Sequence, residues 1–481
     1  MAHKKPQPYL TRSLQHFPLL CLLALVFPGA SALAQEEAAS GNAEPAVEPA
    51  DAAQESSDLE TAAGLEAAFD DEVDEEVLEA AERAMETVAR LEAELSMKDL
   101  FAEERYAEAI AYADRVVELI EEESGESLQL GVALSNLAML QRRVQLYDVS
   151  EQNFVRSVEI IRESEGTYTD AVINPLIGLG VNYQARGDYL DALTIFEEAR
   201  TVSRRVNGLM NEQQLDIIDH LSNTMVSMQR YEEADEFKLS ALNMQERIHG
   251  TETMEILPAI YKYGRWLRSS YRYHEERLQY TRAMDIIRDI AGSEDIALVT
   301  ALRETGNSFR LQKYPEGRGV SALRRALEIA QTQPVPDPEI IAEILIDIGD
   351  WNTSFSKVGP TGEEYLQAWA LLGEVENGDE IRRRRFDDPR YVLRENPSNR
   401  GLSDAGNPDA LPGHVLITFD VDPAGRTRNV TIAEAVPPGL KDDSTARAIN
   451  RSRFRPRIED GEIVWARGMA RNFTFHFVPQ E

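Results

Sequence analysis

A repeat of about 42 residues constrains the fold of this chain more than any other feature. Tyrosines recur 41 or 42 residues apart, a glycine lies 19 residues after five of them, and small residues form a third series in phase. The series are Tyr106, Tyr147, Tyr189, Tyr231, Tyr273 and Tyr314, with Phe355 in the seventh place; Gly125, Gly166, Gly208, Gly250 and Gly292; and Ser157, Ala199, Ala241, Ala283 and Ala326. A fixed period of this length predicts stacked copies of one supersecondary unit.

Each copy reads as a pair of helices. In one of them Ile177, Gly180 and Tyr183 recur at helical spacing, and residues 186–188 interrupt the pattern. The partner helix begins at Tyr189, and Gly208 supplies the positive φ wanted at its end. Its apolar stripe consists of Ala192, Ile195, Phe196 and Ala199.

This pattern resembles the tetratricopeptide repeat, in a form longer than usual, over residues 91–372. We therefore predict a mainly α fold, with a solenoid of about seven helical hairpins over residues 81–375. The resemblance implies a concave groove that binds an extended peptide or another protein and performs no chemistry. Gly319, Pro334, Trp351 and Trp369 depart from the pattern in the last two units. We interpret them as an end cap or, alternatively, as a contact with the next domain.

The first residues predict export from the cytoplasm. Lys4, Lys5 and Arg12 precede an apolar run at residues 17–26, and small residues at 32–34 fit a cleavage site before Gln35. We predict a signal peptide over residues 1–34, or alternatively an uncleaved anchor in the inner membrane. The single cysteine, Cys21, lies inside this segment, so the mature chain would have no disulfide and no thiolate site.

Residues 35–80 contain sixteen carboxylates and no Lys or Arg. Such a stretch repels itself and lacks apolar residues, so we predict a disordered acidic tail that becomes helical towards its end. The net charge of the chain is -34. Because phosphate binding needs clustered Lys and Arg, we expect no nucleic-acid partner.

Residues 376–410 are rich in Gly, Pro, Asn and charge without sustained periodicity, so we predict a linker. Four consecutive arginines at 382–385 are opposite in charge to the acidic tail. We interpret this run as a solvated surface, or alternatively as a clasp on the tail or on an anionic polymer of the envelope.

The last segment, residues 411–481, carries the first strand patterns. Alternating apolar residues predict two strands joined by a turn at 422–425, a helix near 444–453 and a final strand. Ile449 and Phe454 are placed to cover one face of the sheet. The alternating residues are Val415, Ile417, Phe419, Val421, Val430 and Ile432, and then Met469, Phe473, Phe475 and Phe477. The prediction is a small α+β domain of order ββαβ.

This domain resembles the C-terminal domain of the TonB family over almost its whole length. The matching residues are Gly413, Val415, Phe419, Val421, Gly425, Asn429, Val430, Ala448, Phe454, Pro456 and Gly461, with the final aromatic strand. The resemblance implies a periplasmic domain of a Gram-negative cell envelope that takes a short extended segment of an outer-membrane receptor by adding a strand to its sheet edge. It assigns the partner to residues 468–477, and we name as partner-binding residues Arg467, Gly468, Met469, Arg471, Phe473 and Phe475.

Two departures from that family bear on mechanism. Ser13 and His16 lie before the apolar run, not within it, and the solenoid stands where energy-transducing members have a proline-rich spacer. Coupling to a proton motor is therefore left open by the sequence.

We find no catalytic, cofactor or metal pattern and predict that the protein is not an enzyme. His274 begins a sequence like a zinc-protease motif, but Leu278 occupies the place of the second histidine. His414 and His476 lie on predicted strands and are read as structural.

The sequence therefore predicts a periplasmic scaffold that binds other proteins through the repeat groove and the C-terminal sheet edge, with a TonB-dependent receptor as the candidate partner in transport across the membrane. The alternative is an assembly scaffold of the envelope without energy transduction. Membrane contact is expected only if the N-terminus stays uncleaved, in which case the protein would be anchored in the inner membrane and face the periplasm.

Overall fold

The computed structural model describes residues 75–479 apart from 316, 356–361, 404–406 and 408. The predicted signal peptide, and the acidic tail up to residue 74, lie outside the described residues. The chain divides into two compact units, Met1–Gln229 and Arg230–Glu481. No helix in the described part of the chain is both long and apolar enough to cross a bilayer.

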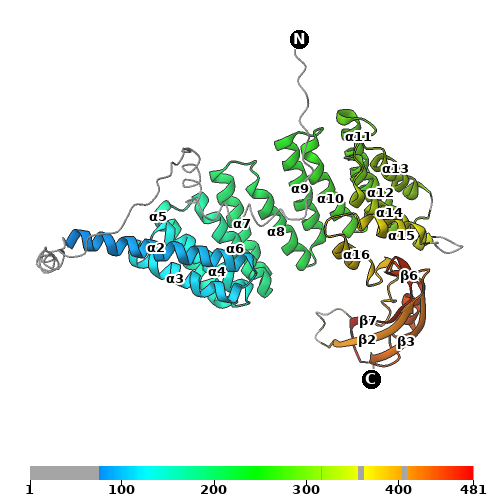
Figure 1. The fold of residues 1–481 in the computed structure, drawn as a ribbon. Helices are drawn as coiled ribbons and strands as arrows, with labels where there is room; N and C mark the ends of the chain where they lie inside the picture. Colours follow the sequence, from blue (N-terminus) through cyan, green and yellow to red (C-terminus); the bar gives the residue numbers. More distant parts are fainter. Residues whose placement is uncertain (1–74, 316, 356–361, 404–406, 408, 480–481) are drawn as a thin grey trace, which may run out of the picture. The chain divides into compact units, whose positions relative to one another are not determined.

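The first unit consists of helices, each packed on the next along the chain (Figure 1). Its core is apolar and continuous from α2 to α5. The elements are α2 (Glu75–Ala102), α3 (Tyr106–Ser124), α4 (Leu128–Arg143), α5 (Tyr147–Glu165), the 3-10 turn η1 (Asp170–Val172), α6 (Ile173–Arg186), α7 (Tyr189–Val206) and α8 (Gln213–Ser227).

The second unit continues the same pattern and then adds the C-terminal domain. One apolar core extends from Leu242 through the last hairpin to Ile458. Its solenoid elements are α9 (Tyr231–His249), η2 (Met254–Ile256), α10 (Leu257–Ser269), α11 (Tyr273–Ala291), α12 (Leu298–Leu311), α13 (Arg318–Gln331), α14 (Pro338–Phe355) and α15 (Glu363–Leu372).

The three repeat series have the structural roles that their spacing predicts, apart from Ala241 and the last two members of the aromatic series. Tyr314 precedes α13, and Phe355 is the last residue of α14. Five of the tyrosines are the first residues of α3, α5, α7, α9 and α11. All five glycines have positive φ, between 59° and 97°. Four of the small residues are completely buried, but Ala241 is only half-buried. Ala241 belongs to α9, which is the first helix of the second compact unit, Arg230–Glu481. Within that compact unit, α9 packs on α10.

A glycine inside a helix permits close contact between the two helices of a hairpin. Gly180 of α6 lies against the ring of Phe196 in α7, and a Cβ added there would come within 2.5 Å of that ring. Phe196 is completely buried, so it has no space into which it can move.

We therefore expect Gly180→Ala to lower the free energy of unfolding by about 1–3 kcal/mol through overpacking. The measurement is chemical denaturation followed by circular dichroism. Gly317→Ala is the control, since an added Cβ there meets no atom within 4 Å and the glycine has no positive φ. Equal stability of the two variants would contradict this account of the helix contact.

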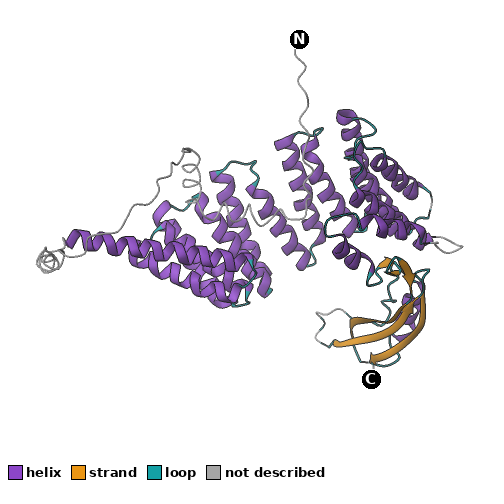
Figure 2. Ribbon diagram, in the orientation of Figure 1, coloured by secondary structure: helices purple, strands orange, loops and turns teal. Residues whose placement is uncertain are grey.

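The C-terminal domain contains a three-stranded antiparallel sheet in the order β3-β2-β7, covered on one face by a helix (Figures 1 and 2). The predicted alternation is correct, because Val415, Ile417, Phe419 and Val421 are all buried. Ile449 and Phe454 complete that core. The elements are β2 (Leu411–Val421), β3 (Thr427–Val436), α17 (Asp442–Arg451) and β7 (Ala466–Phe477), with the short strands β4 (Arg453–Phe454), β5 (Arg457–Glu459) and β6 (Glu462–Val464). The predicted fold class is confirmed.

The prediction of a linker over residues 376–410 is wrong for its first half. Helix α16 (Gly378–Phe386) and strand β1 (Tyr391–Leu393) lie there, and β1 pairs with β4. Phe386 and Val392 are buried. These two apolar residues are isolated in a charged stretch, so no periodic pattern announces them, and they are buried by contacts with segments distant in sequence.

The four arginines at 382–385 are accordingly not one solvated run. The guanidinium of Arg382 lies 3.7 Å from the ring centre of Trp369, and Arg385 pairs with Glu343 at 2.6 Å. Only Arg383 and Arg384 are exposed. Half of this run therefore serves packing inside the second unit.

Candidate functional site

The final strand, β7, lies at an edge of the sheet. It pairs with β2 in continuous antiparallel register from Phe477 opposite Leu411 to Met469 opposite Phe419. Beyond that point β7 contains one extra residue, and Gly468 there has a φ of 67°. This is a β-bulge, and glycine suits this position because a side chain disfavours positive φ. The regular edge of β7 therefore begins after Gly468.

The register also shows which main-chain groups of β7 face away from β2. The carbonyl oxygen of His476 accepts a hydrogen bond from the N–H of Ser403 at 2.9 Å, on the side opposite to β2. In antiparallel pairing the outward residues alternate, so Thr474, Asn472 and Ala470 also direct N–H and C=O outward. Arg471 donates to the Ala470 oxygen at 2.8 Å. Among the described residues, Ser403 is the one residue bridged to this side of β7.

The six residues that we named as partner-binding do not act alike in this geometry. Met469 and Phe473 pack against the core of the domain. Phe475 lies opposite Gly413, close enough that a Cβ on Gly413 would meet its ring at 2.5 Å. The guanidinium of Arg471 lies 6.0 Å from the ring centre of Tyr391.

Only Arg467 and Gly468 of the six are exposed, and Gly468 donates its N–H to Asp420 at 2.9 Å. The predicted set includes core-facing residues such as Met469 and Phe473 and leaves out the alternate residues of the same strand. Asn472 and Thr474 are exposed and carry the outward main-chain groups. The signal was available, since in an edge strand the residues between the core positions include those that face the open side.

A second feature is the junction between the C-terminal domain and the solenoid. Arg455, which follows β4, makes a bidentate ion pair with Asp350 of α14, at 3.0 Å from Nε to Oδ1 and 2.9 Å from Nη2 to Oδ2. Both residues are buried. Tyr365 of α15 donates its hydroxyl to Asp350 at 2.9 Å, and Arg455 also donates to the carbonyl oxygen of Arg385 at 3.3 Å.

Apolar and polar contacts surround this ion pair. Ile458 of β5 and Ile463 of β6 belong to the same apolar core as the helices of the solenoid. Gly461, in the turn between them, lies against Trp369 of α15. At the rim, Lys313 pairs with Glu395 at 2.6 Å. Of the two interpretations of the late tryptophans, contact with the next domain applies to Trp369, whereas Trp351 is buried beside Gly319 inside the solenoid.

The charge state of the junction follows from its contacts. Burial acts to raise the pKa of Asp350, but Arg455 and Arg310 outweigh burial and hold this pKa below its ordinary value. The stability that the pair contributes is therefore present above about pH 4, and it is lost as the pH falls through the lowered pKa.

We expect Arg455→Ala to cost about 3–5 kcal/mol of unfolding free energy, because it leaves the Asp350 carboxylate buried without its counter-ion. The readouts are chemical denaturation and the rate of trypsin cleavage within residues 387–410, which should rise. Lys313→Ala is the matched control at the exposed rim and should cost about 1 kcal/mol or less. An unchanged cleavage rate in Arg455→Ala would contradict the claim that this ion pair holds the C-terminal domain against the solenoid.

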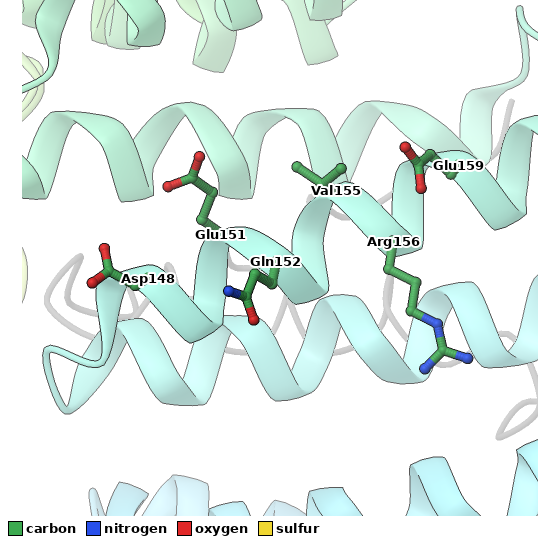
Figure 3. A pocket seen from close by; sticks show the side chains of 6 residues that line it. All are labelled: Asp148, Glu151, Gln152, Val155, Arg156 and Glu159. Atoms are coloured by element: carbon green, nitrogen blue, oxygen red, sulfur yellow. The ribbon is translucent and has the colours of Figure 1, made fainter.

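The first unit offers a shallow polar hollow along α5, with a volume of about 410 Å³ (Figure 3). The sticks in Figure 3 lie along one stretch of helix, as expected for residues three and four apart. Glu151 accepts hydrogen bonds from Tyr183 at 2.8 Å and Arg186 at 2.7 Å, and Arg156 pairs with Glu121 at 2.5 Å. The lining is Asp148, Glu151, Gln152, Val155, Arg156 and Glu159.

The charged groups of this hollow hold neighbouring helices together, since Glu151 of α5 binds side chains of α6 and Arg156 binds Glu121 of α3. Within the described residues, no group of three or more His, Cys, Asp or Glu side chains is arranged to hold a metal ion.

Comparison with known families agrees with this architecture. Residues 129–205 match the tetratricopeptide repeat, and residues 409–477 match the Gram-negative bacterial TonB protein C-terminal domain. Both are families of protein-interaction domains. No curated protein matches the chain.

Solved structures with similar helical repeats have low sequence identity to this chain. BtubC from P. vanneervenii is 17% identical, with 48% of this chain and 95% of that chain covered and a TM-score of 0.37. The C-terminal part of a TPR repeat-containing protein from Cytophaga hutchinsonii is 13% identical, with 59% and 97% covered and a TM-score of 0.38. Aspartyl phosphate phosphatase F from Bacillus subtilis is 12% identical, with 63% and 74% covered and a TM-score of 0.40.

Proposed function

We propose that the protein is a periplasmic interaction scaffold in which the edge of β7 binds an extended segment of one partner and the helical repeats bind another. The observation that carries this proposal is the outward main chain of residues 470–474 in a domain of the TonB C-terminal type. An added strand gains main-chain hydrogen bonds there, and the neighbouring side chains select its sequence. A TonB-dependent outer-membrane receptor is the partner that we infer from the domain type.

Asn472 provides the sharpest test, because its N–H faces the open edge and is not needed for pairing with β2. Proline removes that N–H and places a ring against an incoming strand. We expect Asn472→Pro to weaken binding of receptor-derived peptides at least about fivefold, since one main-chain hydrogen bond contributes about 1 kcal/mol. The measurement is fluorescence anisotropy, with labelled peptides that cover the periplasmic segments of TonB-dependent receptors of the same organism.

Asn472→Ala is the matched control, since it removes the same side chain and keeps the N–H. It should bind as the wild type does. Thermal unfolding of both variants checks that the sheet is intact. Equal affinity of the proline and alanine variants would exclude strand addition at this edge.

The periplasmic location rests on the predicted signal peptide, and the uncleaved anchor is the alternative that would favour a role in energy transfer. We expect cleavage before Gln35. Mass spectrometry of the protein from fractionated cells measures this directly. A chain that begins at Gln35 in the periplasmic fraction agrees with a diffusible scaffold, whereas an intact N-terminus in the inner-membrane fraction contradicts it.

A second candidate function is an assembly scaffold of the cell envelope without a receptor. The structured junction at Arg455 favours it, because energy transduction in the TonB family relies on a domain at the end of an extended spacer, and here helices stand in that place. Failure of every receptor peptide to bind the wild-type protein would leave this second function as the better one.

A further inference from the structure

Three arginines lie close together where β3 begins, and we refer to Arg426, Arg428 and Arg453 as the arginine cluster. Arg426 and Arg453 face each other in an isolated antiparallel bridge. Arg428 lies two residues beyond Arg426, and residues at that spacing share a face of an extended chain. The cluster therefore places three guanidinium groups on adjoining segments of the C-terminal domain.

One carboxylate neutralises only part of this charge. Asp422 pairs with Arg428 at 2.9 Å and accepts the main-chain N–H groups of Ala424 and Arg426, so its oxygens are occupied. Arg453 donates to main-chain oxygens, including that of Ser452 at 2.9 Å. Within the described part of the chain, no carboxylate forms an ion pair with Arg426 or Arg453.

Keeping these cations together is unfavourable without an anion. Like charges on facing residues of a strand pair destabilise it. Burial, and then the neighbouring Arg426 and Arg428, lower the pKa of Arg453, and the opposing effect of Asp422 does not outweigh them. The arrangement is thus suited to a ligand that supplies carboxylates, which guanidinium groups bind in bidentate geometry.

The charge distribution of the chain identifies the ligand. Residues 81–375 contain 51 acidic and 30 basic side chains, whereas residues 411–481 contain nine acidic and ten basic ones. Residues 36–74 contain thirteen carboxylates and no Lys or Arg. An acidic segment of this kind is repelled by the repeat region, and the C-terminal domain is the folded part that does not repel it.

We propose that the acidic segment 36–74 binds the arginine cluster of the C-terminal domain of the same chain. The segment has 39 residues and spans up to about 130 Å when extended. Arg428 is exposed, and Arg426 and Arg453 are half-buried. Binding through these guanidinium groups is electrostatic and is therefore weakened by salt. The interaction consists of ion pairs between carboxylates of the segment and the arginine cluster. This surface is separate from the edge of β7, so the inference does not depend on the proposed receptor binding.

The test is a distance measurement between two nitroxide labels in the full chain, on cysteines introduced by Ser57→Cys and Asn450→Cys with Cys21→Ser. Pulsed electron paramagnetic resonance should give a short-distance population at low salt. In 0.5 M NaCl this population should disappear, because the Debye length falls from about 30 Å at 0.01 M salt to about 4 Å. Arg426→Gln/Arg453→Gln should abolish the same population. A population that persists in this variant would overturn the proposal.

Two further variants make the result independent of folding. Conversion of all thirteen carboxylates of 36–74 to amides leaves the C-terminal domain unaltered and should also abolish the short distances. Arg383→Gln/Arg384→Gln removes two exposed arginines from α16 and should leave them unchanged. Dilution of labelled with unlabelled protein completes the test, because loss of the short distances on dilution would place the segment on a second copy and contradict binding within one chain.

Discussion

The buried ion pair between Arg455 and Asp350 is the interaction on which the arrangement of the second unit depends. Removing two charges from water is costly, and the cost is met only when geometry is good and the remaining polar groups are satisfied. Here the fork of Arg455 meets both oxygens of Asp350, and Tyr365 supplies a further hydrogen bond. A pair of this kind tolerates little displacement, so it fixes the position of β4, and through β4 that of β1, against α14.

Further ion pairs continue from this junction into the solenoid. Arg385 and Arg303 both reach Glu343 of α14, at 2.6 Å and 3.2 Å, and Arg303 also reaches Asp347. One repeat earlier, Arg268 of α10 pairs with Glu304 of α12 at 2.5 Å. Each of these pairs joins two helices that have one helix between them in the chain, namely α16 and α14, α12 and α14, and α10 and α12. The C-terminal domain follows this series of charged contacts and shares the same apolar core.

Sequence reasoning succeeded where one residue type recurs in phase, and failed where a single residue acts through a distant partner. The repeat series and the alternation in β2 predicted the helical hairpins and the sheet, because burial imposes those periods locally. Arg455 and Asp350 are 105 residues apart, and neither belongs to a pattern. The same limit explains the linker: Phe386 and Val392 have no periodic apolar neighbours. At β7 the strand was predicted, but the choice of side chains favoured core residues, because hydrophobicity marks the packed face and not the open edge.

Some surfaces of the C-terminal domain pack against the solenoid, and others are open to a partner. Segments β4 and β5–β6 are engaged with the solenoid, and α17 covers the sheet. β7 is one edge of the sheet and β3 is the other, with β2 between them, and the residue just before β3, Arg426, is bridged to Arg453. Neighbouring strands lie about 4.8 Å apart, so the two edges are separated by about 10 Å. A strand added at β7 extends the sheet away from β3. An acidic segment held at the arginine cluster would therefore leave the β7 edge open, and the two ligands could be bound together.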